Sequence, residues 1–134
     1  MDITKTLHVT DPLEWRRWLR LNHKKETEIW LVYHKKHTGQ PRISYNDAVE
    51  QALCFGWIDS IAKSLDADRT AQRFTPRRPG VPYSQANKER LRHLAARGQL
   101  SKAVKDSVQD ILTEKFTVPP DILKAIRAVN AAWS

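Results

Sequence analysis

Residues 52–63 read "ALCFGWIDSIAK", an apolar segment that meets a glycine and is followed at once by a tryptophan, an isoleucine and a single aspartate. Gly56 predicts the end of a helix, because glycine readily takes the left-handed conformation found after a helix C-terminus. The next residues predict a strand, "DADR" a turn and "TAQRFT" a returning strand, which together form a hairpin over about 57–75. The stretch therefore predicts a helix that leads directly into an antiparallel pair of strands.

Segments on either side of this junction predict one more strand and several helices. "TEIWLVYHKK" (27–36) is aromatic and β-branched on both faces, which is typical of a strand covered on both sides. Asp11 and Ser44 are capping residues before helical apolar stripes, the second of which ends near Phe55. The order α-β-α-β-β-α-α-α predicts an α+β fold with a small, three-stranded, mainly antiparallel sheet packed with helices. The later helices are expected over 84–98, after Ser101, and in a final segment with Ile122, Ile126, Val129 and Trp133 on one face.

Length and composition indicate one domain of ordinary size. The 134 residues are 40% hydrophobic, and we expect an α/β part with the hairpin over 1–83 and a helical part over 84–134. One cysteine excludes an internal disulfide, and four glycines cannot form a glycine-rich phosphate loop. No N-terminal apolar run resembles a signal peptide and no stretch approaches the length of a membrane span, so a cytoplasmic location is expected.

The net charge of +8 is concentrated in one segment of the chain. Residues 69–105 hold ten Lys/Arg and a single acidic residue, whereas residues 1–68 hold equal numbers of basic and acidic residues. Such asymmetry favours an anionic partner, for example a nucleic acid or a phosphorylated molecule. A solvated basic surface without a partner is the alternative.

Asp59 is a carboxylate placed among apolar residues. A regular strand puts it on one face with Trp57, Ile61, Lys63 and Leu65. A partly buried carboxylate needs a hydrogen-bond donor or a cation, or it becomes protonated. The arginines of the following strand and loop are the expected partners, since Lys63 lies about 13 Å away at strand rise. Two interpretations stay open: an ion pair that fixes the hairpin against the helices, or a carboxylate that faces a ligand.

The segment "RFTPRRPGVPYSQANK" (73–88) combines three arginines with a helix N-terminus. Arginine side chains and the free backbone N–H groups at a helix start both favour phosphate or carboxylate groups. Prolines restrict the loop, and an aromatic side chain is available to stack on a ligand. The predicted ligand-binding residues are Trp57, Asp59, Arg73, Arg77, Arg78, Tyr83, Ser84 and Asn87.

The predicted helix over 84–98 carries basic side chains away from its apolar stripe. Such a helix could track a nucleic-acid backbone, with Tyr83 and Phe74 stacking on bases. Alternatively, Leu91 and Leu94 dock the helix and the charges only keep it solvated. The sequence has no helix-turn-helix, zinc-finger or RNA-recognition signature. The candidate contacts to a nucleic-acid backbone are Lys88, Arg90, Arg92 and Arg97.

Neither a metal site nor a cofactor is expected. The five histidines are scattered, and His34 and His37 have no third ligand at metal-binding spacing. Cys54 is interpreted as a small core residue at the end of a helix, because no activating base is visible beside it.

Five segments carry a family resemblance, in this order: "WRRWLRLNH", "EIWLVYHKKHTG", "SYNDAVEQALCFGWIDS", "QRFTPRRP" and "YSQANKERLRHLAARGQLS". They resemble the YdeI/OmpD-associated family, also described as bacteriocin-protection proteins, over residues 11–130. That family is grouped with the YjbR/CyaY-like superfamily, whose YjbR-type members have been proposed to bind DNA. The resemblance implies a bacterial protein linked to tolerance of bacteriocins or antimicrobial peptides and to an outer-membrane porin. The matching motif positions are Trp57, Asp59, Arg73, Pro76, Arg77, Ser84 and Asn87.

Two features depart from the pattern of that family. Tyr83 stands before the capping serine, where the family usually has tryptophan, so the aromatic side chain is kept but its shape differs. Related chains continue past the last helix with a further basic helical segment, whereas this sequence ends at Ser134. The sequence is therefore expected to be either a short form or a truncated one.

The leading hypothesis is a non-enzymatic binding domain whose arginines hold an anionic group of a nucleic acid or a phosphorylated small molecule. The rival is an enzyme in which Asp59 is the general base for an arginine-bound substrate. A pocket that holds Asp59 within reach of Arg77 would favour the enzyme, whereas a flat basic face with Asp59 ion-paired would favour nucleic acid. The third alternative is a protein-interaction module, which a large exposed apolar patch would indicate.

Overall fold

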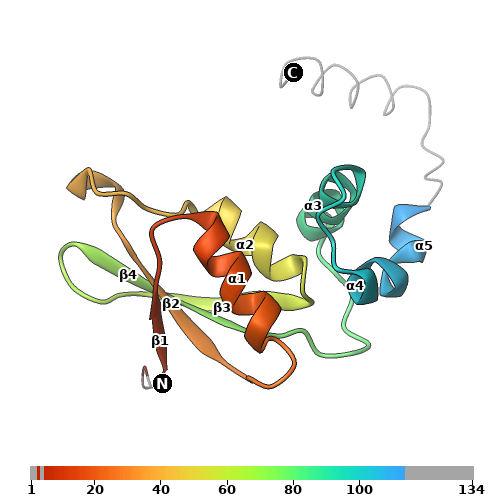
Figure 1. Ribbon diagram of the computed structural model, residues 1–134, viewed down its shortest axis with the longest axis horizontal. Coiled ribbons are helices and arrows are strands. Elements are labelled where there is room, and N and C mark those ends of the chain that lie inside the picture. The colour runs from red at the N-terminus through yellow and green to blue at the C-terminus, as the bar shows by residue number, and fades with distance from the viewer. Residues whose placement is uncertain (1–2, 4, 114–134) are drawn as a thin grey trace, which may run out of the picture.

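The protein is an α+β structure built on a four-stranded sheet (Figure 1). The computed structural model describes residue 3 and residues 5–113. Its strands are β1 (Thr6–His8), β2 (Ile29–His34), β3 (Trp57–Ser64) and β4 (Arg69–Pro76). Its helices are α1 (Pro12–Asn22), α2 (Tyr45–Leu53), α3 (Gln85–Ala96), α4 (Lys102–Ser107) and α5 (Gln109–Leu112), with a short 3-10 helix η1 (Lys36–Thr38).

The strand order across the sheet is β1-β2-β4-β3, and the sheet is mixed. β1 runs parallel to β2, with Thr6 opposite Trp30, whereas β4 is antiparallel to both β2 and β3. The α+β class and the hairpin are confirmed, but the expectation of a three-stranded sheet is wrong. The sequence does not reveal β1, because three residues are too few to display the alternation that identifies a strand. The predicted final helix lies outside the described residues.

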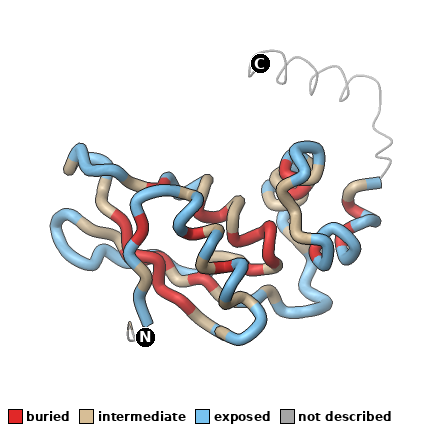
Figure 2. The backbone as a smooth tube through the Cα atoms, viewed as in Figure 1, coloured by how far each residue is buried: buried red, intermediate tan, exposed pale blue. Residues whose placement is uncertain are grey.

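Helices α1 and α2 cover one face of the sheet through an aromatic core (Figures 1 and 2). Trp15 of α1 is 0% exposed, and its Nε1 donates to the carbonyl of Ala48 in α2 at 2.9 Å. Its ring packs against Phe74 of β4, with 5.0 Å between the centroids, and stacks on Trp18 at 5.6 Å. One tryptophan therefore ties α1 both to α2 and to the sheet.

Capping side chains set the helix starts that the sequence predicts. Asp11 Oδ1 accepts hydrogen bonds from the backbone N–H groups of Leu13 at 2.8 Å and Glu14 at 3.0 Å. These bonds satisfy donors that have no partner within the first turn of α1. The serines before α2, α3 and α4 cap their helices in the same way, through Ser44, Ser84 and Ser101.

β2 is buried on both faces, as its sequence predicts. Its odd-numbered residues join the main core under the helices, whereas Trp30 and Val32 form a small cluster on the opposite face. Ala71 belongs to the same cluster and Ile3 packs against it, and the Lys63 ammonium lies 6.0 Å from the centroid of the Trp30 ring. The aliphatic stem of such a lysine can cover apolar surface while its charge stays in water.

A β-bulge in β3 changes which residues share a face. Asp59 pairs with Phe74 and Ala62 pairs with Gln72, so three steps along β3 match two steps along β4. The expectation that Lys63 shares a face with Asp59 is therefore wrong, and Lys63 lies on the opposite side. An inserted residue is recognised only against the partner strand, so alternation within β3 could not indicate it.

Gly56 lies where the end of α2, the hairpin and the following loop meet. Its φ is 78°, which confirms the predicted helix end, and its N–H donates to the Leu53 carbonyl at 3.2 Å. Its own carbonyl accepts from the N–H of Arg77, just after β4, at 2.9 Å. Nearby, the Cys54 carbonyl accepts from the N–H of Ser101 at 3.0 Å, which attaches the start of α4 to the same place.

The helices after the hairpin belong to the same main core as the sheet. α3 contributes Leu91 and Leu94, α4 contributes Val104, and Val108 and Ile111 follow it. Shared burial of this kind holds α3, α4 and α5 against α2 and the sheet. Across the part of the chain that is described, no helix combines the length and the apolar character needed to cross a bilayer.

Two leucines of α1 give a direct test of this core. Leu19 is 0% exposed and Leu21 is 63% exposed. Leu19→Ala should lower the free energy of unfolding by about 2–5 kcal/mol, because it removes buried methyl groups and leaves a cavity. Leu21→Ala should change it by no more than about 0.5 kcal/mol. Urea denaturation checks both values, and equal losses for the two variants would contradict the observed packing of α1.

Candidate functional site

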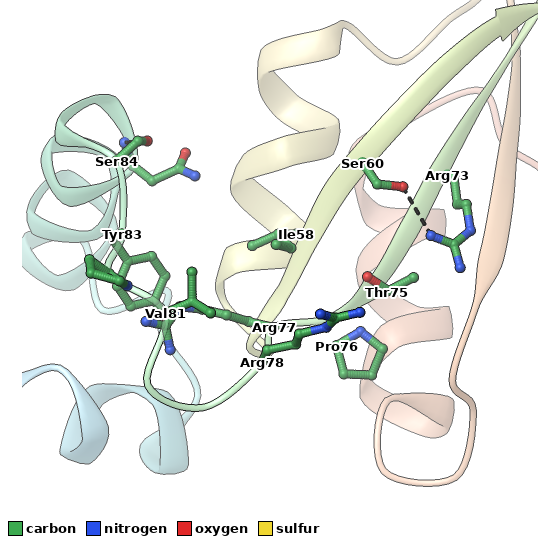
Figure 3. A pocket seen from close by; sticks show the side chains of 12 residues that line it. Ile58, Ser60, Arg73, Thr75, Pro76, Arg77, Arg78, Val81, Tyr83 and Ser84 are labelled. Carbon is green, nitrogen blue, oxygen red and sulfur yellow. Dashed lines mark hydrogen bonds between the residues drawn. The ribbon is translucent and has the colours of Figure 1, made fainter.

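A pocket with a volume of about 490 Å³ opens between the hairpin and the start of α3 (Figure 3). Three parts of the chain that are distant in sequence line it. Its lining consists of Ile58 and Ser60 from β3, Arg73, Thr75 and Pro76 from β4, Arg77, Arg78, Val81, Pro82, Tyr83 and Ser84 from the loop, and Asn87 from α3.

Six of the eight predicted ligand residues line this pocket: Arg73, Arg77, Arg78, Tyr83, Ser84 and Asn87. Trp57 and Asp59 do not line it, because side chains alternate along a strand and β3 turns Ile58 and Ser60 toward the pocket instead. Ile58, Ser60 and Thr75 line the pocket but were not predicted as ligand-binding residues from the sequence. The alternation within β3 puts Ile58 and Ser60 on one face, but it does not show which face lines the pocket, and the pairing of Ile58 with Thr75 is seen only in the structure.

Arg77 and Tyr83 form a stacked pair at the pocket wall. The Arg77 guanidinium carbon lies 3.8 Å from the centroid of the Tyr83 ring, which is cation–π geometry. Burial raises the pKa of the Tyr83 phenol, although the charge of Arg77 acts in the opposite direction. The phenol therefore stays protonated and neutral at physiological pH. The contact places the guanidinium beside the ring, while its N–H groups remain donors for a ligand.

Arg73 is held by a carboxylate outside the pocket. Its Nη2 donates to Glu28 Oε2 at 2.9 Å, and its Nη1 donates to Ser60 Oγ at 3.2 Å. The hydrogen bond from Arg73 lowers the pKa of the Glu28 carboxyl, and desolvation only partly opposes it. Arg73 is thus already neutralised, which limits its share in binding an external anion.

The side-chain contacts of Arg77 and Arg78 differ from those of Arg73. Among the described residues, neither guanidinium forms a hydrogen bond or an ion pair. Other arginines in the same basic segment do have carboxylate partners: Arg69 pairs with Asp66 at 2.8 Å. Within the part of the chain that the structure describes, two adjacent cations without a counter-ion therefore face one pocket, which an anionic ligand would complement.

The start of α3 presents polar groups to the same pocket. Ser84 Oγ accepts from the N–H of Asn87 at 3.2 Å and caps the helix. Asn87 Oδ1 accepts from Arg90 Nη1 at 3.0 Å, which fixes the side-chain amide. The backbone N–H groups of the first turn and the helix dipole favour negative charge at this end.

Asp59 has a partner of a different kind from the one predicted. Its Oδ2 accepts a hydrogen bond from the Tyr45 phenol of α2 at 2.9 Å, and within the described residues no arginine pairs with it. Burial and this hydrogen bond raise the pKa of the Tyr45 phenol. Trp57 is 1% exposed, and its Nε1 donates to the His23 carbonyl at 3.3 Å. Both residues therefore fasten the hairpin to the helices.

The four basic residues proposed to follow a nucleic-acid backbone point to different partners. Arg90 Nε donates to Asn46 Oδ1 at 3.1 Å, on the side of α2. Arg92 donates to the Ile111 carbonyl at 3.2 Å, on the side of α5. Arg97 donates to the imidazole of His93, while Lys88 lines a second, smaller cavity. These side chains do not form one continuous basic face along α3.

The described residues contain no group of three or more His, Cys, Asp or Glu side chains placed to hold a metal ion. Cys54 is buried, and desolvation raises the pKa of its thiol, which keeps it protonated. This agrees with its interpretation as a core residue.

Comparison with known proteins gives a family but no function. Residues 7–107 match the sequence model of a family described as "Domain of unknown function (DUF8412)". The match covers well over half of the chain, so the protein belongs to this family. No curated protein and no solved structure is significantly similar to it.

The Glu28–Arg73 pair predicts a pH-dependent contribution to stability. Glu28→Gln should lower the free energy of unfolding by about 0.5–1 kcal/mol near neutral pH, where the partly exposed pair is ionised. The pKa of Glu28 is lowered from its ordinary 4.5, so the contribution is complete above that value. It should disappear as the pH falls through the lower pKa of the folded state.

Urea denaturation at about pH 7 and about pH 3 measures this difference. Asp106→Asn removes an exposed carboxylate that has no described partner, and it is the control. An equal loss at both pH values for Glu28→Gln would show that the ion pair is not its cause.

Proposed function

We propose that this member of the DUF8412 family is a non-enzymatic binding domain whose main pocket, the 490 Å³ pocket described above, holds an anionic group. The observation that carries the proposal is the pair of unneutralised guanidinium groups, Arg77 and Arg78, at one pocket wall. Charge-assisted hydrogen bonds from such groups contribute about 1.5–3 kcal/mol each, which is enough to set the affinity of a small ligand.

Phosphate is the group that suits the main pocket best. Arginine N–H groups match two oxygens of a phosphate at once, and the start of α3 adds backbone donors and a favourable dipole. Among the described residues, no acidic side chain lines the pocket, so none of them repels a dianion there. The volume of about 490 Å³ lies within the range of about 300–1,000 Å³ that is usual for small-molecule pockets.

A phosphorylated small molecule is favoured over a nucleic-acid strand. Backbone tracking needs several cations along one path. Arg90 and Arg92 are instead engaged by neighbouring helices. What remains is a localised cationic pocket, which is suited to one or two phosphate groups.

The rival hypothesis, an enzyme with Asp59 as the general base, has less support. A general base must come within hydrogen-bond reach of the proton that it removes. Asp59 lies on the other face of β3 from the pocket, and the Tyr45 phenol occupies one of its oxygens. A substrate held by Arg77 would therefore lie outside hydrogen-bond reach of this carboxylate.

The resemblance to the YdeI/OmpD-associated family suggests a setting for this activity. We propose that the protein acts in the cytoplasm of a bacterium, where binding of a phosphorylated metabolite is linked to tolerance of bacteriocins or antimicrobial peptides. The arginine loop and the helix after it carry both the resemblance and the pocket.

NMR titration of the labelled protein tests the proposed site. Pyrophosphate and a short single-stranded oligonucleotide are the probes. The variant Arg77→Ala/Arg78→Ala should bind pyrophosphate at least about 100-fold more weakly than the wild type, as expected for the loss of two charged donors. If the oligonucleotide also binds, its affinity should fall steeply with salt, and the double variant should flatten that dependence.

A matched control separates the site from the net charge. Arg17→Ala/Arg20→Ala removes the same charge from the exposed side of α1, away from the pocket, and should change the affinity by less than about threefold. Equal weakening in both double variants, or a wild type that binds neither probe at low salt, would refute the proposed function.

A further inference from the structure

A second cavity, of about 240 Å³, adjoins the main pocket at the Arg77–Tyr83 pair. It shares Arg77, Pro82 and Tyr83 with the main pocket, so the Arg77–Tyr83 pair borders both of them. The volume is below the range of about 300–1,000 Å³ that holds a whole drug-sized ligand. The second cavity is therefore suited to one part of a ligand whose other part occupies the main pocket.

The chemistry of the second cavity differs from that of the main pocket. Lys88 of α3 and Asp110 of α5 both line it, and neither side chain forms a hydrogen bond or an ion pair with any described residue. The Ser107 hydroxyl donates to the Val104 carbonyl at 2.8 Å, so its oxygen can still accept. The cavity offers a cationic donor, an anionic acceptor and a hydroxyl oxygen beside an aromatic ring.

These groups do not suit a second phosphate, because the Asp110 carboxylate would repel it. They suit groups that donate and accept hydrogen bonds together, which is the property of neighbouring hydroxyl groups. A carboxylate accepts from one hydroxyl, while an ammonium donates to the next. The carbon skeleton between them can lie against the Tyr83 ring.

We infer that the ligand is a phosphate monoester of a polyhydroxylated compound, of the sugar-phosphate class. The phosphate binds Arg77 and Arg78 in the main pocket, and the hydroxyl groups bind Lys88 and Asp110 in the second cavity. Arg77 is the shared cation, since it lines both cavities. This inference rests on the proposed anion site and adds the chemical class of the group to which the phosphate is attached.

Three probes test the inference by calorimetric titration: ribose 5-phosphate, monobutyl phosphate and inorganic phosphate. The wild type should bind ribose 5-phosphate at least about tenfold more tightly than monobutyl phosphate, which has a similar chain length but no hydroxyl groups. Asp110→Asn should lower the affinity for ribose 5-phosphate about tenfold and leave that for monobutyl phosphate unchanged. A nucleoside 5′-monophosphate, as a fourth probe, tells whether a free sugar phosphate or a nucleotide is preferred.

Asp106→Asn is the matched control, because it removes the same charge from the exposed surface of the neighbouring helix α4. It should leave all affinities within about twofold of the wild type. Equal wild-type affinities for ribose 5-phosphate and monobutyl phosphate would overturn the inference, as would an Asp110→Asn variant that loses both equally. In those cases the anion site itself still stands. If the wild type binds none of the probes, the proposed function fails together with the inference.

Discussion

The backbone hydrogen bond from Arg77 to the Gly56 carbonyl is the contact on which the geometry of the pocket depends. It joins the end of α2 to the first residue after the hairpin and so sets the direction in which the loop leaves the sheet. The bond requires Gly56 to hold a φ of 78°, a region that costs other residues about 1–2 kcal/mol. Gly56 thus has two roles. It ends helix α2, and its carbonyl holds the start of the arginine loop in place.

Local signals made much of the fold predictable. The caps at Asp11 and Ser44, the helix end at Gly56 and the hairpin all follow from residues a few positions apart. Two features escaped prediction because they depend on a partner strand. β1 exists as a strand only by pairing with β2, and the bulge after Asp59 exists only relative to β4. Neither feature produces a periodic pattern of apolar residues in its own segment.

The site was predictable to the extent that charge determines it. A run of arginines without acidic neighbours indicated the loop, and Arg77 and Arg78 do line a pocket. The orientation of β3 was not predictable, because a strand with apolar residues on both faces does not show which face the helices cover. Asp59 and Trp57 were predicted to bind the ligand, yet both contact the helices or the residue after α1 rather than the pocket.

The bulge in β3 has a consequence for how the molecule behaves in a crowded cell. β3 forms one edge of the sheet, and the edge of a sheet offers unpaired N–H and C=O groups to any passing extended chain. The extra residue between Asp59 and Ala62 breaks the regular spacing of those groups and increases the local twist. A second molecule therefore finds no continuous ladder to extend, and the bulge protects this edge against edge-to-edge aggregation.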